Sequence, residues 1–260
     1  MMFRAATLAA LVAYAAAQSL STNCTAALTG IAANPDASKC LSPGSLVSVV
    51  AAGANNSIIP PINNWLTSLC GAPACSNDTI AAVVKNVTEG CSTELSGLGF
   101  TSSLTPSITS IIQQYYPTVR KVVCLKDGDT NCVTQTLTNI QDTVGTLSLT
   151  NLAQIALNPP TSLPANVTCT NCVKAAYNII NTDVPSIVAD VAPALQSQCG
   201  ASFTDGTTPS GISQSASTAD ASSTSKAAAL GSVSMMSRGV VAGLGASGLV
   251  VLSTVFTFLA

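Results

Sequence analysis

Apolar side chains recur along the middle of the chain with the spacing of one helix face. Between Ile80 and Val87 they stand at i, i+3, i+4 and i+7, after Ser76 as a candidate N-cap and before Gly90 at the expected C′ position. Similar stripes predict four more helices, formed by Ile108, Ile111, Ile112, Tyr115, Val119 and Val122; by Val133, Leu137, Ile140 and Val144; by Val173, Ala176, Tyr177 and Ile180; and by Ile187, Val191, Leu195 and Cys199.

Prolines indicate where these helices begin and bend. Thr105-Pro106 predicts a cap followed by proline at the first helical position, Pro117 is expected to kink that helix, and Pro193 to kink the last one. Alternation with a period of two is scarce, so the sequence predicts an all-α bundle of about eight or nine short helices. The shorter members are expected at Thr25–Ala33, Leu46–Ala52, Ile62–Leu69 and Leu149–Leu157.

The first 17 residues have the layout of a secretory signal peptide. Arg4 precedes a mostly apolar run that ends in the small residues Ala15 and Ala17, which is an A-x-A-like cleavage site. A buried helix or a membrane anchor is the alternative, but the run is short for a spanning helix. The mature chain is therefore expected to begin at Gln18.

The segment Gly239–Ala260 is apolar and carries no charge. No Lys or Arg follows it to orient a spanning helix, and small residues lie upstream of it, which is the arrangement of a GPI-attachment signal. The alternative is a single membrane span without a cytoplasmic domain. The candidate acceptor residues for the GPI anchor are Ser222, Ser223, Ser225 and Gly231.

Between the domain and this tail the composition changes. Residues 204–226 contain 12 Ser or Thr in 23 positions, and Ile212 is their only large apolar residue. Such a segment cannot bury a core and is typical of a disordered, O-glycosylated stalk. The expected organisation is a signal peptide over 1–17, a disulfide-rich helical domain over 18–202, a Ser/Thr-rich stalk and GPI-attachment region over 203–238, and a tail over 239–260 that is removed on anchoring.

Ten cysteines lie inside the predicted domain. An even number behind a signal peptide indicates a disulfide framework, whose pairing the sequence leaves open; the short loops Cys124–Cys132 and Cys70–Cys75 are candidates only. Five cysteines precede Gly97 and five follow it, a faint sign of duplication, although the spacings of the two sets match poorly. The ten are Cys24, Cys40, Cys70, Cys75, Cys91, Cys124, Cys132, Cys169, Cys172 and Cys199.

Five N-glycosylation sequons support an extracellular location. Short sequons occur by chance, but five of them behind a signal peptide predict that several carry glycans. Their asparagines are Asn23, Asn55, Asn77, Asn86 and Asn166.

Charge and composition exclude several classes of protein. The chain has no histidine, which removes Ser-His-Asp triads, Cys-His dyads and imidazole metal ligands. A net charge of −2 gives too little positive field for a nucleic-acid-binding protein. The only basic doublet, Arg120-Lys121, is expected on a solvated helix face. No cofactor, metal site or catalytic residue is predicted.

Carboxylate pairs for glycoside hydrolysis are the remaining enzyme option, because such sites need no histidine. The candidates are Glu89 with Glu94 and Asp183 with Asp190, although a solubilising role explains them as well. If two of these carboxyl groups faced each other across a cleft, catalysis would be favoured.

Three further motifs have structural explanations. The Cys169-Thr170-Asn171-Cys172 motif has no second CxxC to complete a zinc site, so a structural disulfide is favoured. The stretch beginning at Asp127 lacks the Glu that a calcium loop needs at its twelfth position, where Thr138 stands; a turn that caps the next helix is favoured. Trp65 is expected in the core rather than as a platform for sugar stacking.

Several motifs between Cys24 and Ser213 form one pattern with the cysteines Cys70 and Cys91. They are Asn63-Asn64-Trp65-Leu66, Cys75-Ser76-Asn77-Asp78-Thr79, Tyr116-Pro117-Thr118-Val119-Arg120, Cys124-Leu125-Lys126-Asp127, Asn131-Cys132-Val133-Thr134-Gln135-Thr136-Leu137, Cys169-Thr170-Asn171-Cys172, Ser202-Phe203-Thr204-Asp205-Gly206 and Pro209-Ser210-Gly211-Ile212-Ser213. This pattern resembles that of a family of secreted, cysteine-rich and often GPI-anchored proteins of basidiomycete fungi, whose function is unknown. The resemblance implies a fungal source and surface attachment, but no activity or site residues.

These observations lead to one expectation and two alternatives. The expectation is a GPI-anchored glycoprotein of the cell surface or cell wall, not an enzyme, with the membrane and wall glycans or other surface proteins as its partners. One alternative is a protein that binds a small apolar ligand, such as a sterol or fatty acid, between its helices. The other is an enzyme that acts on wall polysaccharide.

Overall fold

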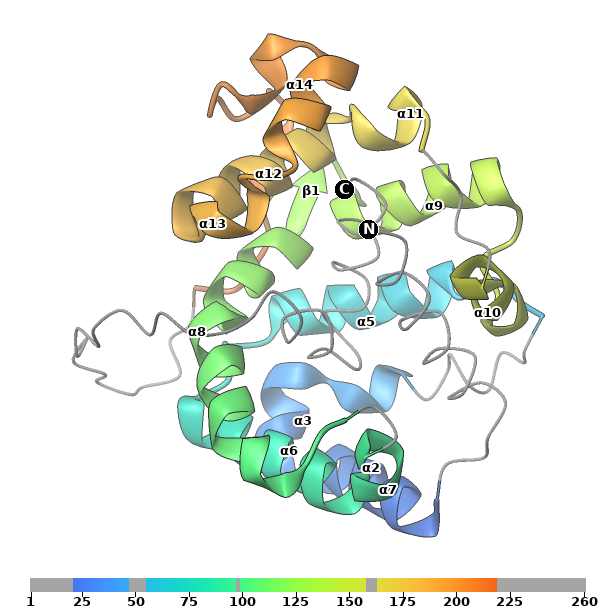
Figure 1. Ribbon diagram of the computed structural model, residues 1–260, viewed down its shortest axis with the longest axis vertical. Helices are drawn as coiled ribbons and strands as arrows, with labels where there is room; N and C mark the ends of the chain where they lie inside the picture. The colour runs from blue at the N-terminus through green and yellow to red at the C-terminus, as the bar shows by residue number, and fades with distance from the viewer. Residues whose placement is uncertain (1–20, 47–54, 97–98, 158–162, 219–260) are drawn as a thin grey trace.

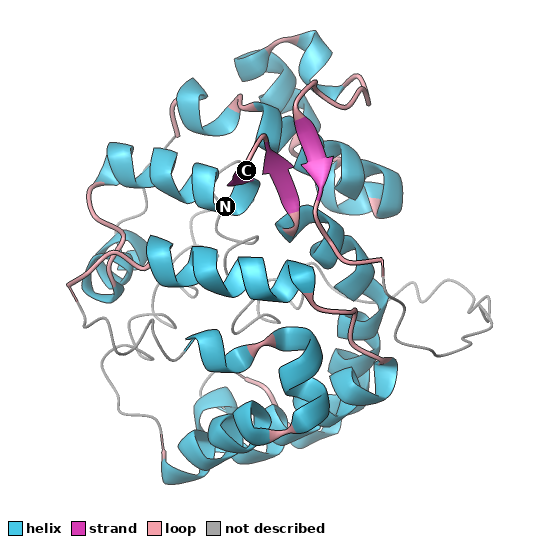
Figure 2. Cartoon of the chain, turned by 180° about the vertical axis from the view of Figure 1, so that it is seen from behind, coloured by secondary structure: helices cyan, strands magenta, loops and turns pink. Residues whose placement is uncertain are grey.

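A computed structural model describes residues 21–46, 55–96, 99–157 and 163–218. These residues form twelve α-helices and one small sheet (Figure 2), which confirms the all-α class. Nine of the helices have seven residues or more, so the expected eight or nine corresponds to the longer ones. The signal segment, the apolar tail and the GPI acceptor candidates lie outside the described residues.

Four helices form a layer at the bottom of Figure 1, which we call the N-terminal lobe. Ser21 caps its first helix by accepting a hydrogen bond from the Cys24 N–H at 3.2 Å, and Asn34 caps its second in the same way. Both side chains satisfy N–H groups that the first helical turn leaves free. The helices are α2 (Thr22–Ala33), α3 (Pro35–Leu41), α6 (Asn77–Gly90) and α7 (Ser92–Ser96).

In α6 the predicted cap is confirmed, and the role expected for Gly90 is wrong. The Ser76 hydroxyl accepts a hydrogen bond from the Thr79 N–H at 3.1 Å. Gly90 is the last helical residue, and Cys91 follows as the C-cap. A Cβ at Gly90 would collide with Ala27 Cβ, so glycine is needed there because α2 and α6 pack closely, not to end the helix in a left-handed conformation.

A central layer separates this lobe from the upper part of the molecule (Figure 1). The predicted helix at Ile62–Leu69 is longer in the structure, and the one at Leu149–Leu157 has the predicted bounds. Most of the helix expected at Leu46–Ala52 lies outside the described residues. The central elements are η1 (Pro43–Leu46), α5 (Ile59–Gly71), α9 (Cys132–Val144) and α10 (Leu149–Leu157), and α11 (Ala165–Thr168) lies above α9, towards the top of Figure 1.

The top of Figure 1 is the C-terminal lobe, made of three helices and one 3-10 turn. The last predicted stripe, expected as one kinked helix, is divided between two helices, because Pro193 lies in the first turn of the second one. A proline at that position lacks only an N–H that has no helical partner. The elements are α12 (Asn171–Asp183), α13 (Pro185–Val188), α14 (Ala192–Cys199) and η3 (Ala201–Thr204).

Helix α8 (Thr105–Val123) connects the two lobes along one side of the molecule (Figure 1). It follows the short η2 turn (Ser102–Leu104), packs against α6 in the N-terminal lobe and against α12 in the C-terminal lobe. Pro106 occupies the first turn as predicted, whereas the N-cap is Leu104 rather than Thr105. The helix continues past Pro117 to Val123.

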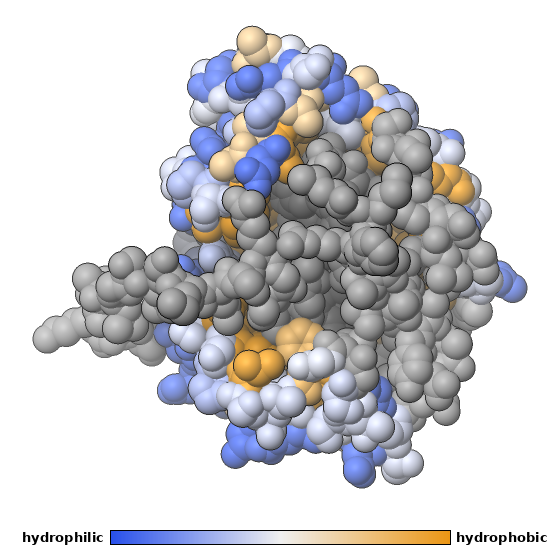
Figure 3. Space-filling model, viewed as in Figure 1, coloured by the Kyte–Doolittle hydropathy of each residue, from blue (hydrophilic) through white to orange (hydrophobic). Residues whose placement is uncertain are grey.

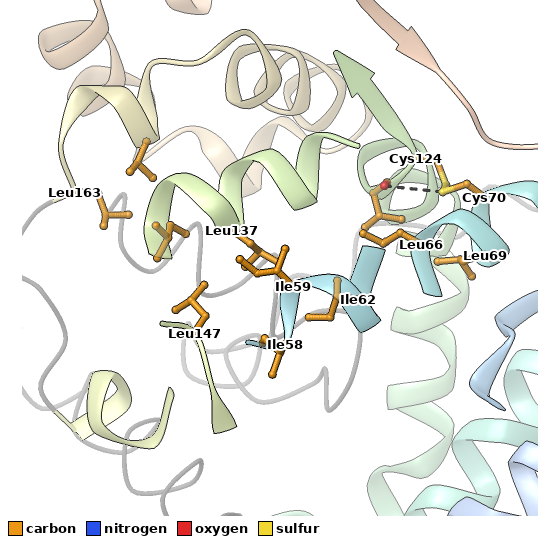
Figure 4. Close-up of a cluster of buried hydrophobic side chains, with 13 residues drawn as sticks. Ile58, Ile59, Ile62, Leu66, Leu69, Cys70, Cys124, Leu137, Leu147 and Leu163 are labelled. Carbon is orange, nitrogen blue, oxygen red and sulfur yellow. Dashed lines mark hydrogen bonds between the residues drawn. A yellow bond between two sulfur atoms is a disulfide. The ribbon is translucent and has the colours of Figure 1, made fainter. Parts of the chain in front are cut away.

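The largest core cluster lies between α5, α9 and the end of α8 (Figure 4). Leu66 and Leu147 are each 1% exposed, and the Cys70–Cys124 disulfide closes one end of the cluster. Hydrophilic residues cover much of the described surface in Figure 3, and the hydrophobic atoms that are visible lie in small groups between them. The core is therefore centred on α5, with a smaller cluster in each lobe.

All ten cysteines are paired, which confirms the disulfide framework but neither short-loop candidate. The N-terminal pairs are nested, the C-terminal pairs interleave, and one pair connects the two sets. This difference in connectivity argues against a repeated disulfide pattern. The pairs are Cys24–Cys91, Cys40–Cys75, Cys70–Cys124, Cys132–Cys172 and Cys169–Cys199.

The expected domain boundary at residue 202 is wrong. Phe203 is buried in the C-terminal lobe, and β3 (Ile212–Gln214) pairs antiparallel with β1 (Leu125–Asp127). Strand β1 also pairs with β2 (Thr130–Asn131), so that the sheet order is β2-β1-β3. The first part of the Ser/Thr-rich segment belongs to the folded domain, because its backbone forms the third strand of this sheet. The described domain therefore extends to Thr218.

The same segment makes hydrogen bonds to both residues of the Cys70–Cys124 disulfide, which joins α5 of the central layer to the end of α8. The Ser215 N–H donates to the Cys124 carbonyl at 2.9 Å, and the Ser217 N–H donates to the Cys70 carbonyl at 2.7 Å. Residues 212–217 therefore contact both halves of the Cys70–Cys124 pair.

Candidate functional site

All five sequon asparagines have exposed side chains. Asn23 lies on α2, Asn77 and Asn86 lie on α6, and Asn166 lies on α11. Asn55, which precedes α5, accepts a hydrogen bond from the Thr150 hydroxyl at 3.1 Å. In contrast, Asn131 and Asn178, which are in no sequon, are buried.

The larger of two described hollows lies between α3 and α6, and we call it the α3–α6 groove. Its volume is about 460 Å³, within the range of small-molecule sites. The Cys40–Cys75 disulfide forms part of its wall. Its other walls combine apolar side chains, among them Ile31, Pro73, Ala82 and Val83, with the polar side chains of Asn34, Asp36, Lys39, Ser76, Asp78, Thr79 and Asn86.

The carboxylates of this groove also stabilise the ends of helices. Asp36 and Asp78 lie in the first turns of α3 and α6, where a negative charge interacts favourably with the helix dipole. Asp36 also pairs with Lys39 at 3.8 Å, with both side chains more than 70% exposed. With two carboxylates and one ammonium group, the groove is suited to an uncharged polar ligand that offers hydroxyl and amide groups.

A second hollow, of about 230 Å³, lies on the other side of Cys75 against α8. Asn77 and Tyr116 line it, and the Tyr116 hydroxyl accepts a hydrogen bond from the Cys75 N–H at 2.9 Å. A sequon asparagine therefore lines each of the two hollows. We call this one the α8 hollow.

Arg120, which also lines the α8 hollow, is 6% exposed, so the expectation of a solvated basic doublet is wrong for it. Its guanidinium donates to the carbonyl oxygens of Leu69 at 2.9 Å, of Ala72 and, at 3.4 Å, of Ser217. The first two carbonyls belong to the C-terminal end of α5, which favours a positive charge. Through these hydrogen bonds Arg120 connects α8 to the end of α5 and to the 212–217 segment. Its position indicates a structural role.

The structure places the four candidate catalytic carboxylates in two separate regions. Glu89 and Glu94 are in the N-terminal lobe, whereas Asp183 and Asp190 are at the ends of α12 and α13, at the other end of the molecule (Figure 1). Glu89 lies 3.9 Å from the Lys85 ammonium, and both side chains are exposed.

Two of these carboxylates have structural partners. Glu94 accepts a hydrogen bond from the Ser21 N–H at 2.7 Å, which lowers the pKa of its carboxyl group. Asp183 accepts hydrogen bonds from the Lys121 ammonium at 2.9 Å and the Thr118 hydroxyl at 2.8 Å, and both lower its pKa. A general acid needs a raised pKa, so the shifts of Glu94 and Asp183 are opposite to those of a glycosidase acid.

The other predicted motifs have structural roles. Cys169 and Cys172 both form disulfides, although not with each other. The Asp127-Gly128 turn joins β1 to β2, and the cap of α9 is the Asn131 side chain. Trp65 packs against the largest core cluster, and its indole N–H donates to the Leu41 carbonyl at 2.8 Å.

The described residues contain neither a cluster of metal ligands nor a helix that could span a membrane. Within residues 21–46, 55–96, 99–157 and 163–218, no group of three or more His, Cys, Asp or Glu side chains could hold a metal ion. No helix in these ranges is both long and apolar enough to cross a membrane.

Sequence reasoning missed the α3–α6 groove. It exists because Asn34, Pro73 and the Cys40–Cys75 disulfide set α3 beside α6, and that pairing has no local signal in the sequence. The repetition of Asp78, Ala82 and Asn86 at intervals of four residues was a visible signal that these residues share one face of α6. No protein-family model, curated protein or solved structure matches the chain.

Proposed function

We propose that the protein is a GPI-anchored glycoprotein of the cell surface or cell wall, with a structural or interaction role. The observation that carries the proposal is that one helical domain combines five disulfides with five exposed sequon asparagines. Disulfides of this number are typical of extracellular and secreted proteins. Glycans on exposed asparagines would supply the solubility that a chain with only 8% charged residues otherwise lacks.

The two alternatives have less support from the described residues. An apolar ligand calls for an enclosed apolar cavity of roughly 300 Å³ or more. The α3–α6 groove has polar and charged walls, and the α8 hollow is smaller. Hydrolysis of a wall polysaccharide calls for facing carboxylates about 5 to 9.5 Å apart across a cleft. None of the four candidates lines the α3–α6 groove or the α8 hollow. One member of each pair, Glu94 or Asp183, is held by structural hydrogen bonds that lower the pKa of its carboxyl group.

The revised domain boundary changes the geometry of the proposed attachment. Four to thirteen residues separate Thr218 from the acceptor candidates Ser222, Ser223, Ser225 and Gly231. A chain of that length spans at most about 13 to 47 Å. The proposed anchor therefore keeps the folded domain within about 47 Å of its attachment point, closer to the membrane than a stalk beginning at residue 203 would.

Phospholipase release tests the anchor directly. The full chain, with an epitope tag inserted after Gln18, is expressed in yeast, and intact cells are treated with phosphatidylinositol-specific phospholipase C. We expect the tag to appear in the medium, and mass spectrometry of the released C-terminus to find ethanolamine on Ser222, Ser223, Ser225 or Gly231.

A variant that ends at Arg238 is the matched control, because it lacks only the apolar tail. We expect it to be secreted without enzyme treatment. If the full chain stayed on the cells after phospholipase treatment and its C-terminal residues were still present, it would be a membrane-spanning protein and the GPI proposal would be wrong.

A further inference from the structure

The side chain of Asn86 is directed to the α3–α6 groove by its position on α6. Asp78, Ala82 and Asn86 are four residues apart, and Thr79 and Val83 complete the same face. All five line the groove. Any group attached to the Asn86 amide therefore begins at the groove wall.

The groove has the chemistry of a sugar site. The carboxylates of Asp36 and Asp78 can accept hydrogen bonds from hydroxyl groups, and Asn34 and Lys39 can donate to carbonyl and ring oxygens. Ile31 and Val83 offer apolar surface for the C–H face of a pyranose ring. The excess of one negative charge disfavours anionic ligands, so a neutral N-acetylated sugar fits this set of groups.

We propose that the α3–α6 groove holds the first two N-acetylglucosamine residues of a glycan attached to Asn86. The inference rests on the proposed glycosylation. Attachment transfers an oligosaccharide from a lipid-linked pyrophosphate donor: the bond from sugar C1 to the pyrophosphate oxygen breaks, the bond from C1 to Asn86 Nδ2 forms, and Nδ2 gives up one proton. A glycan seated there covers the Cys40–Cys75 disulfide and occupies the groove.

Asn166 is the natural control within the same chain. Its side chain is exposed on α11, and it lines neither the α3–α6 groove nor the α8 hollow. A glycan on Asn166 therefore has no described hollow to enter.

Site-resolved deglycosylation compares the two asparagines. The full chain is expressed in yeast to carry oligomannose glycans, then treated in its native state with an endoglycosidase that cuts between the first two N-acetylglucosamines. Glycopeptide mass spectrometry follows each site with time. We expect cleavage at Asn86 to be about tenfold slower than at Asn166, since one or two net hydrogen bonds suffice to keep the sugars in the groove most of the time. After reduction and unfolding, the two rates should agree.

Ala82→Trp tests whether the groove itself slows cleavage at Asn86, because Ala82 is exposed and lines the groove. An indole there fills the space of the sugars, so cleavage at Asn86 should rise to the rate at Asn166, and the rate at Asn166 should not change. If the slow cleavage at Asn86 survived this substitution, its cause would lie outside the groove and the inference would be wrong.

Two other outcomes would also overturn the inference. Equal native rates at Asn86 and Asn166 would show that the groove does not hold the glycan. An Asn86 without glycan, in a chain glycosylated elsewhere, would contradict this inference and leave the proposed function standing. A chain without glycans at all five sequons would contradict both.

Discussion

The two lobes of the molecule are cross-linked in different patterns. In the N-terminal lobe the Cys24–Cys91 pair encloses the Cys40–Cys75 pair along the sequence, with loops of 67 and 35 residues. In the C-terminal region Cys132–Cys172 and Cys169–Cys199 interleave, with loops of 40 and 30 residues. Only Cys70–Cys124 joins the two sets.

The lobes also differ in how much apolar side chain they bury. The N-terminal cluster contains three buried aliphatic side chains beside its cystine, Ile80, Val84 and Ile108. The C-terminal cluster contains eight buried apolar residues, including Tyr177, Leu195 and Phe203. Three of the five sequons, at Asn23, Asn77 and Asn86, lie in the lobe with the smaller cluster.

Disulfides and apolar packing therefore contribute in different proportions to the stability of the two lobes. A small cluster supplies little stabilisation, and two disulfides in the N-terminal lobe compensate by restricting its unfolded chain. The C-terminal lobe has a larger packed interior, and its disulfides connect it to the central layer. This difference can be tested, beginning with the disulfide that joins the central layer to α8, the helix that packs against both lobes.

Loss of the Cys70–Cys124 disulfide should affect the largest part of the molecule. Cys70 and Cys124 are 3% and 0% exposed, and both carbonyls accept hydrogen bonds from the 212–217 segment. Replacing both cysteines by alanine should lower the free energy of unfolding by about 2 to 5 kcal/mol. Hydrogen exchange measured by mass spectrometry should accelerate in both lobes.

The matched control is the double replacement of Cys169 and Cys199 by alanine, which opens a 30-residue loop inside the C-terminal region. Its exchange should accelerate in α12 to α14 and remain unchanged in α2, α3 and α6. Equal effects of the two double variants on the N-terminal lobe would show that the lobes are a single unit and remove the basis of the comparison.

One phenylalanine in each lobe allows the packing to be compared directly. Phe203 is 6% exposed within the C-terminal cluster, whereas Phe100 is partly buried at the edge of the N-terminal one. Phe203→Ala should lower the free energy of unfolding by about 3 to 5 kcal/mol, and Phe100→Ala by clearly less. Urea unfolding followed by circular dichroism measures both.

Phe203→Ala also tests the corrected boundary. A residue in a solvated stalk would tolerate alanine without a change in stability. An unaltered urea midpoint for Phe203→Ala would place Phe203 outside the folded domain after all.

The caps of α6 and α12 are matched between the lobes and should behave alike. Each follows a disulfide-bonded cysteine: Ser76 accepts from the Thr79 N–H at 3.1 Å, and Thr170 accepts from the Val173 N–H at 3.2 Å. Ser76→Ala and Thr170→Ala should each lower the free energy of unfolding by about 1 kcal/mol. Urea unfolding followed by circular dichroism measures both variants. If only one substitution lowered the free energy of unfolding, the lobes would differ in local helix stability as well as in cross-links.

The Ser76 cap is an example of what the sequence could predict, because it depends only on neighbouring residues. The helix around Ile80 and Val87 was recognised because its apolar period and its cap are local, and both survive in the fold. Cysteine pairing was out of reach because it depends on how α5 lies against α8, which brings Cys70 to Cys124 across 54 residues.

The C-terminal boundary and the groove were missed for a related reason. The segment from Ile212 has the composition of a stalk. Its backbone pairs with the edge of β1, and no residue type within the segment predicts that pairing. The α3–α6 groove likewise forms only after two helices from different parts of the chain are packed together, although Asn86 itself was identified from its sequon.

The smallest expected effect is an acid-dependent contact in the C-terminal lobe. Asp205 accepts hydrogen bonds from the Thr207 hydroxyl at 2.7 Å and pairs with the Lys174 ammonium at 2.9 Å. Together they lower its pKa from 3.8 to about 2. Since the folded-state pKa is the lower one, the stabilisation is complete above the unfolded value of 3.8 and disappears as the pH falls through about 2.

Asp205→Asn should therefore melt slightly below the wild type at pH 5, and this difference should decline from about pH 4 and vanish below about pH 2. The comparable pair in the N-terminal lobe, Asp36 with Lys39 at 3.8 Å, is largely exposed, and such pairs contribute little. At pH 5 we expect Asp36→Asn to melt closer to the wild type than Asp205→Asn does, because it loses only this exposed pair and a weak interaction with the dipole of the α3 helix. A difference that persisted for Asp205→Asn well below pH 2 would show that Asp205 acts through packing around Thr207, because the carboxyl group is protonated there.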